Sequence, residues 1–169
     1  MNLRAAFLLS SCVMTIVVMS ACGDIKPVWK GDMNMEKQGY TLHYSEDPVE
    51  FQLDLKASES DLDLMLELMI SYYVGISRSE LPLFIVLENE NHDLFEYTSE
   101  VILKEDDTWL GIPQQNEIDY SLTHIAIPEL RLKPGTYTLR IYANDEAQES
   151  IYGVVNIEAR LYMREILPE

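Results

Sequence analysis

The sequence predicts an all-β protein, a single antiparallel β-sandwich of jelly-roll type with about eight strands. Three observations lead to this fold class. Apolar and polar residues alternate with period two from Tyr40 onward, the alternating runs recur about every 8 to 15 residues, and neither a βαβ pattern nor a repeat interrupts them. The chain has 169 residues, of which 47% are hydrophobic, so one core is the expected organisation.

The first predicted strands are the clearest. Residues 40–44 and 49–56 alternate cleanly, which predicts two strands with one buried face each. Residues 62–76 continue the alternation, although their Leu, Met and Glu favour a helix and Asp61 offers it a cap. Apolar residues at strict period two would be scattered around a helix, and the later part of this segment is β-branched and aromatic. A long strand is therefore predicted.

The rest of the chain repeats this pattern. Residues 81–88 (LPLFIVLE) form a continuous apolar run, which is typical of a strand covered on both faces. A polar turn at 89–92 predicts a hairpin, and Lys-Pro-Gly at 133–135 predicts a second turn. The remaining predicted strands are 93–104, 122–128, 136–143 and 151–163.

The N-terminal segment predicts where the protein is located. Arg4 precedes an uncharged apolar run over 5–21 that ends in small residues, which is the pattern of a secretory signal. The string Met-Ser-Ala-Cys at 19–22 resembles the lipobox of bacterial lipoproteins. That resemblance implies removal of residues 1–21 and attachment of acyl chains such as palmitate to Cys22, which would hold the protein on a membrane. An ordinary secreted protein with an early cysteine is the alternative.

Residues 22–39 combine Gly, Pro and charge without either period, which predicts a tether between the lipid and a β-sandwich domain over 40–169. Trp29 is the exception, and we expect it to dock on the domain rather than to lie at the membrane interface. Gly23, not Asp, follows the cysteine, so lipoprotein sorting favours the outer membrane of a bacterial cell envelope.

Charge and cysteine content exclude several classes of function. The net charge of −17 repels nucleic-acid phosphates, so no nucleic-acid partner is expected. Cys12 lies in the signal and Cys22 carries the lipid, so the mature domain keeps no thiol for a disulfide, a zinc site or a nucleophile. The sequence also contains no glycine-rich phosphate loop, GxSxG elbow or HExxH motif. We therefore expect no enzyme, no catalytic residue and no cofactor.

The titratable residues have simple structural explanations. His43 and His124 occupy polar positions of predicted strands, where a solvent-facing or hydrogen-bonded structural role is commoner than metal ligation, and His92 lies in a turn. Carboxylates gather over 88–107 and over 59–63, but their spacing fits no EF-hand loop. We expect a solvated acidic surface and no metal. Carboxylate pairs suited to glycoside hydrolysis arise by chance among so many acids, so they indicate little.

Aromatic residues offer a binding hypothesis. Most of the rings are expected in the core, but Tyr73 is out of phase with the apolar series of 62–76. Such an outward ring is a candidate for an interaction surface, toward either a protein or a glycan.

Three stretches of the C-terminal half carry a family resemblance: Trp109-Leu110-Gly111, residues 134–141 (PGTYTLRI) and residues 152–161 (YGVVNIEARL). In this order and spacing they look like the gliding-motility-associated lipoproteins of the GldH type, loosely over 49–161. That family combines a lipobox signal with a β-rich body of about this length, and its WLG element follows an acidic strand-turn. The resemblance makes Trp109 an aromatic anchor beside Gly111, a residue free to take positive φ, and a second candidate for an interaction surface. A buried Trp beside an ordinary turn is the alternative.

The resemblance implies an envelope-anchored accessory of the gliding machinery and its associated secretion apparatus. Its partners would be the membrane, through the lipid, and other envelope proteins, and it would act without catalysis. A surface glycan-binding lipoprotein is the alternative, which predicts coplanar exposed aromatics in a groove. A carboxylate-dependent hydrolase is the third hypothesis, which predicts a concave site with acids about 5 to 10 Å apart.

Overall fold

The computed structural model describes residues 26–55, 60–76, 78–114, 118–145 and 150–164. The predicted signal over 1–21 and the predicted lipidation site Cys22 lie outside these ranges. In the described part of the chain, no helix has the length and apolar character needed to cross a bilayer.

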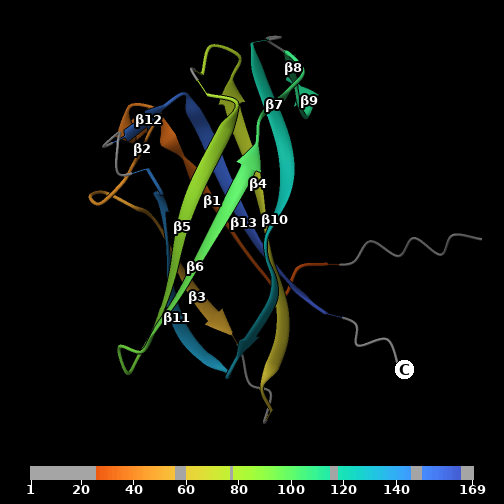
Figure 1. Ribbon diagram of the computed structural model, residues 1–169. Coiled ribbons are helices and arrows are strands. Elements are labelled where there is room, and N and C mark those ends of the chain that lie inside the picture. Colours follow the sequence, from red (N-terminus) through yellow and green to blue (C-terminus); the bar gives the residue numbers. More distant parts are fainter. Residues whose placement is uncertain (1–25, 56–59, 77, 115–117, 146–149, 165–169) are drawn as a thin grey trace, which may run out of the picture.

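Two antiparallel sheets face each other across one core, which confirms the predicted all-β sandwich (Figure 1). The elements are β1 (Trp29–Asn34), η1 (Met35–Gln38, a 3-10 helix), β2 (Thr41–His43), β3 (Val49–Leu55), β4 (Leu62–Tyr73), β5 (Glu80–Asn89), β6 (Leu94–Ile102), β7 (Lys104–Glu105), β8 (Thr108–Trp109), β9 (Ile112–Pro113), β10 (Asp119–Leu132), β11 (Gly135–Ala143), β12 (Ser150–Tyr152) and β13 (Val154–Met163). The five-stranded sheet has the order β1-β13-β4-β10-β9, and the four-stranded sheet has the order β3-β11-β5-β6. Two short ladders, β12-β2 and β7-β8, lie at the upper end in Figure 1. The predicted jelly-roll path stays a prediction.

β4 is the central strand of the five-stranded sheet, and its surroundings explain why it is not a helix. Every second side chain from Leu64 to Tyr72 is fully buried, whereas the side chains between them are partly exposed. β13 and β10 flank β4, so Leu68 lies opposite Ala159 on one strand and opposite His124 on the other. Both backbone edges of β4 are thus hydrogen-bonded, and this pairing outweighs the helical preference of its Leu, Met and Glu.

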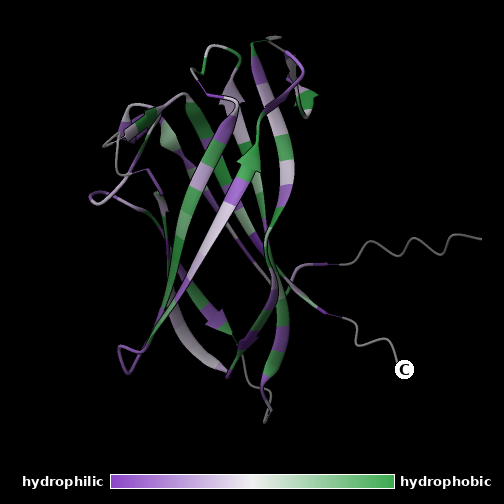
Figure 2. Cartoon of the chain, in the orientation of Figure 1, coloured by the Kyte–Doolittle hydropathy of each residue, from purple (hydrophilic) through white to green (hydrophobic). Residues whose placement is uncertain are grey.

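The four-stranded sheet follows the same rule, with one correction to the prediction. β3 alternates strictly between buried and exposed side chains, and Leu81 and Leu87 of β5 are fully buried. Figure 2 shows this alternation as hydrophobic and hydrophilic colours along the strands. The prediction that residues 81–88 are covered on both faces is wrong, because the outward Phe84 is only partly buried and lines an open groove.

The predicted tether is also wrong over residues 29–38. This stretch forms β1 and η1, and β1 pairs with β13 along all six of its residues. The Trp29 ring packs edge-on against Phe51 with its centroid 5.9 Å away, which confirms that Trp29 docks on the domain. Trp29 and Met33 both pack against the core, so every second residue of β1 faces inward. The inward position between them is Gly31, which has no apolar side chain, so the alternation cannot be recognised from the sequence.

Two further strand bounds differ from those predicted. β10 is longer than the predicted 122–128, and the predicted strand over 151–163 is interrupted at Gly153. Gly153 has a φ of +112°, and a Cβ built there would lie 3.2 Å from Cβ of Ile76. Only glycine adopts this backbone without strain, and the chain passes there from β12, which pairs with β2, to β13, which pairs with β1 and β4.

The two sheets approach each other along both long edges. Trp29 of β1 reaches Phe51 of β3 at one edge, and His124 Nε2 of β10 lies 2.7 Å from Ser99 Oγ of β6 at the other. The His124 prediction of a hydrogen-bonded structural role is confirmed. Burial lowers the pKa of His124, so the neutral imidazole is favoured.

The start of β1 and the end of β13 lie side by side (Figure 1). The Val28 amide donates to the carbonyl of Leu161 at 2.8 Å, and Leu161 lies opposite Leu66 on β4. Tyr73 is at the far end of β4, about 23 Å from Leu66 at about 3.3 Å per residue. The chain therefore enters the sandwich well away from the end that carries Tyr73.

Candidate functional site

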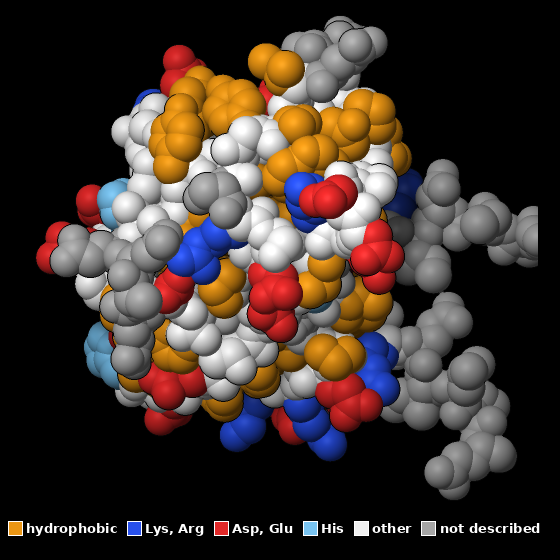
Figure 3. All heavy atoms as spheres, turned by 45° about the horizontal axis from the view of Figure 1, so that its top comes forward, with side chains coloured by type: hydrophobic (Ala, Val, Ile, Leu, Met, Phe, Trp, Pro, Cys, Tyr) orange, Lys and Arg blue, Asp and Glu red, His pale blue; other side chains and the backbone are white. Residues whose placement is uncertain are grey.

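One end of the sandwich carries an open apolar surface, here called the apolar tip. Ile118 and Tyr152 are 58% and 64% exposed there. Figure 3 turns this end forward and shows hydrophobic side chains gathered over it. The tip surrounds a hollow of about 550 Å³ lined by Tyr73, Val74, Gly75, Ile76, Ile118, Tyr152 and Gly153.

Backbone hydrogen bonds fix the shape of the apolar tip. The Tyr73 amide donates to the Gly153 carbonyl at 2.9 Å, and the Val74 amide donates to the Ile118 carbonyl at 2.9 Å. The Gly153 amide in turn donates to the Tyr40 carbonyl at 2.8 Å. Four segments far apart in the sequence are thereby joined, so the exposed side chains stand on a hydrogen-bonded framework.

Tyr73 lies at this tip with its ring on the side opposite to the core-facing Tyr72, as its phase predicts. The Tyr73 ring packs edge-on against Tyr40, with centroids 5.6 Å apart. The pKa of Tyr73 is raised, mainly because the phenol is partly removed from water and to a smaller extent by electrostatic interaction with Tyr40 and Asp119. The phenol is therefore neutral and can take part in apolar and hydrogen-bonding contacts at the same time.

Trp109 has a different setting from Tyr73. Its ring is partly buried and lies 5.9 Å from the ring of Tyr72, and Lys104 Nζ lies 5.3 Å from the Trp109 ring centroid. Gly111 has a φ of +96°, and a Cβ there would lie 2.4 Å from the carbonyl oxygen of Ser121. The predicted positive φ of Gly111 is confirmed, whereas an interaction role of Trp109 stays a prediction, and Trp109 is not among the side chains that line the tip.

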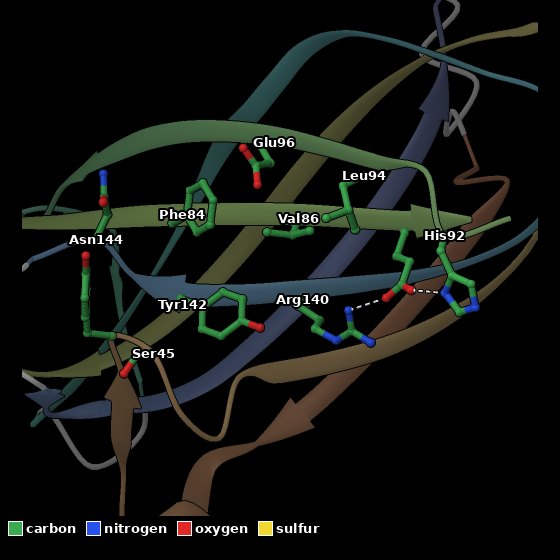
Figure 4. A pocket seen from close by; sticks show the side chains of 11 residues that line it. Ser45, Phe84, Val86, His92, Leu94, Glu96, Arg140, Tyr142 and Asn144 are labelled. Carbon is green, nitrogen blue, oxygen red and sulfur yellow. Dashed lines mark hydrogen bonds and ion pairs between the residues drawn. The ribbon is translucent and has the colours of Figure 1, made fainter. Parts of the chain in front are cut away.

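The outer face of the four-stranded sheet carries a second hollow, here called the sheet groove (Figure 4). Its volume is about 680 Å³, within the range of small-molecule sites. Strands β5, β6 and β11 form its base, and the segment after β2 forms one wall. The lining residues are Tyr44, Ser45, Phe84, Val86, Glu88, His92, Leu94, Glu96, Arg140, Tyr142 and Asn144.

The floor of the sheet groove is aromatic and apolar. Phe84 of β5 lies directly opposite Tyr142 of β11, with ring centroids 6.2 Å apart and ring planes inclined by 39°. Val86 is the next residue on this face of β5 and is only 8% exposed. The sequence prediction missed this site, although Tyr142 is out of phase with the buried residues of its strand, the same signal that identified Tyr73.

Three charged side chains of the sheet groove, Arg140, Glu88 and His92, form one hydrogen-bonded group. Arg140 donates from Nε to Glu50 at 2.9 Å and from Nη1 to Glu88 at 2.6 Å. His92 Nδ1 lies 2.5 Å from the other carboxylate oxygen of Glu88, as the dashed lines in Figure 4 show. The hydrogen bonds from His92 and Arg140 lower the pKa of Glu88, so this carboxylate stays ionised at neutral pH.

The acidic segments do not converge on an ion. In the described ranges, no group of three or more His, Cys, Asp or Glu side chains could hold a metal. Arg131 Nε lies 3.2 Å from Asp61 and 3.9 Å from Asp63, and Lys104 donates to Asp107 at 2.9 Å. The acids are therefore dispersed along solvated surface and partly neutralised by cations.

Comparisons with known proteins place this chain in no family. No family model and no curated protein matches the sequence. Among solved structures, a CocE/NonD family hydrolase from Staphylococcus aureus is 13% identical, with a TM-score of 0.24. The match covers 83% of this chain but spans only 32% of that one. So weak a likeness carries no argument about fold or activity.

Proposed function

We propose that this chain is a lipid-anchored accessory protein of the bacterial cell envelope that works by binding neighbouring envelope proteins and not by catalysis. The anchor is Cys22, supported by the lipobox-like string at 19–22 and by the uncharged run before it. The resemblance to GldH-type lipoproteins supports a role beside the gliding machinery and its secretion apparatus, with the outer membrane as the proposed location.

The position of the apolar tip is the observation that carries the binding role. A chain anchored through its N-terminal segment is held at β1, beside Leu161, and Tyr73 lies about 23 Å further along the sheet. The tip is thus separated from the point of attachment and accessible to a neighbour. Exposed aromatic and aliphatic side chains grouped on a rigid framework are typical of protein interfaces.

The charge of the chain indicates the chemistry of such a partner. The net charge is −17, and Asp119 lies close enough to Tyr73 to raise the pKa of that phenol. A partner with an apolar centre and a basic rim complements this surface, because opposite charges speed encounter and fix orientation.

The sheet groove supports binding rather than general acid catalysis. A general acid needs a carboxyl whose pKa is raised toward neutrality. Glu88 has the opposite shift, because His92 and Arg140 both stabilise its ionised form. The aromatic floor of the same groove favours the second candidate function, glycan binding, which is developed below.

Photo-crosslinking in living cells tests the tip. We expect p-benzoylphenylalanine at position 118 to form a covalent adduct with one envelope protein, and the same group at position 125 to form none. Ile125 is the matched control, since it is 50% exposed on the same strand as Asp119 but outside the tip. Equal adducts from both positions, or an adduct at 118 that survives Tyr152→Ser unchanged, would contradict the binding role of the tip.

Metabolic labelling with radioactive palmitate tests the anchor separately. The unaltered chain should incorporate label and remain in the membrane fraction, whereas Cys22→Ala should do neither. Incorporation into Cys22→Ala would refute the lipidation site while leaving the crosslinking result interpretable.

A further inference from the structure

We infer that the sheet groove is a binding site for a neutral oligosaccharide. Its features are an aromatic floor, a polar rim and an arginine, Arg140, that is already paired with two carboxylates. This inference does not depend on the apolar tip, because the groove lies on the outer face of β5, β6 and β11, none of which contributes a side chain to the tip.

The floor suits the apolar face of a sugar ring. Phe84 and Tyr142 are both partly exposed and stand opposite each other on neighbouring strands, so together they offer a continuous π surface. Their planes are inclined by 39°, which gives a bent rather than a flat platform. A bent platform matches a single soluble chain whose successive rings turn, and it does not match the flat face of a crystalline polysaccharide.

The rim supplies groups suited to sugar hydroxyls. Ser45, Glu96 and Asn144 are exposed at the edges of the groove, and the phenol of Tyr142 adds a donor and acceptor beside them. From Phe84 to Glu88 the groove runs about 13 Å along β5. That length accommodates more than one sugar ring.

The sheet face disfavours an extended peptide as the occupant. β11 is paired with β3 and β5, and β5 is paired with β11 and β6, so the backbone beneath Phe84 and Tyr142 is used within the sheet, whereas β6 is an edge strand. An added peptide strand needs unpaired backbone at a sheet edge. Recognition on the aromatic floor, between β5 and β11, must therefore come from side chains, as for a ligand rich in hydroxyls.

The electrostatics select a neutral ligand over an anionic one. Arg140 is the one Lys or Arg among the residues that line the groove, and Glu50 and Glu88 already bind its guanidinium at 2.9 Å and 2.6 Å. Glu96 adds a further negative charge at the rim, on a chain whose net charge is −17. An acidic polysaccharide would be repelled on approach.

Calorimetric titration of the full-length lipoprotein in detergent micelles tests the inference. The probes are neutral hexasaccharides of glucose, mannose, xylose and N-acetylglucosamine, with oligogalacturonate as the anionic comparison. We expect at least one neutral probe to bind, and both Phe84→Ala and Tyr142→Ala to weaken it about tenfold or more. Tyr142→Phe should keep most of the affinity, because it retains the ring.

A matched control separates the groove from general effects. Tyr152→Ala removes an exposed ring at the tip, outside the groove, so it should not change binding. Hydrogen exchange on the unaltered protein should show sugar-dependent protection confined to strands β5, β6 and β11 and to the segment that contains Ser45. This measurement stands even if an alanine variant misfolds.

Three results would overturn the inference: no neutral probe binds, oligogalacturonate binds more tightly than every neutral probe, or sugar-dependent protection falls outside the groove. Each leaves the crosslinking test of the tip unaffected.

Discussion

Replacing Tyr72 by phenylalanine removes one buried hydroxyl whose partners are known. Tyr72 is fully buried, and its Oη lies 2.6 Å from the carbonyl oxygen of Leu110 and 3.0 Å from that of Leu103. The Leu103 carbonyl also accepts from the Leu110 amide at 2.9 Å, so it keeps a donor in the variant. The Leu110 carbonyl loses its bond to the phenol, which predicts a destabilisation of about 1–2 kcal/mol. Burial raises the pKa of Tyr72 to about 12, so the unaltered hydroxyl is protonated and donating at any ordinary pH.

Urea unfolding measures this loss. With a slope of about 2 kcal/mol per molar urea, the midpoint should fall by roughly 0.5–1 M without a change of slope. Tyr152→Phe is the control, since Tyr152 is 64% exposed and loses the same atom to solvent, and its midpoint should barely move. A Tyr72→Phe midpoint equal to that of the unaltered protein would refute the claim that this hydroxyl ties β4 to the segment around Trp109.

Three further predictions concern backbone strain and charge. Gly153→Ala should destabilise the protein by about 1–3 kcal/mol in urea unfolding, because its φ is +112° and the new Cβ would lie 3.2 Å from Ile76; an unchanged midpoint would contradict this. Burial lowers the pKa of His124, so the stability that depends on its neutral form is complete above a pH of about 6.5 and is lost as the pH falls below it. His124→Gln should remove that part of the pH dependence of the unfolding midpoint, and an unaltered profile would show that His124 is not its source. Arg140→Met should raise the pKa of Glu88 in a carbon-detected NMR titration, because a hydrogen-bonding cation is lost, and a pKa that stays low would assign the shift to other groups.

The strands that the sequence predicts correctly are those whose buried face is continuous. β3 and β4 carry a large apolar side chain at every second position, so the period is visible without knowledge of the partner strands. β1 was not predicted, because Gly31 occupies its middle inward position and only Trp29 and Met33 are apolar at the alternating positions. The interruption at Gly153 arises from contact with Ile76, which no local pattern reveals.

Some residues of the candidate sites can also be predicted from the sequence, and others cannot. The outward direction of Tyr73 follows from the alternation within its own strand, and the alternation in β11 likewise places Tyr142 on the outer face. Phe84 was concealed in an apolar run, because its role depends on β11 lying beside β5 and placing Tyr142 opposite it. The pairing of strands distant in sequence creates the sheet groove, so only the folded protein shows it.

The direction of β1 bears on how the molecule would transmit mechanical tension. β1 enters beside Leu161 and runs antiparallel to β13 toward the end of the sandwich that carries Tyr73. In the proposed arrangement, a pull between the lipid anchor and a partner at that end acts along the strand axis, at right angles to the hydrogen bonds that hold β1. All six paired residues would then share the load at once, instead of giving way one by one, which makes this edge strand a mechanical clamp.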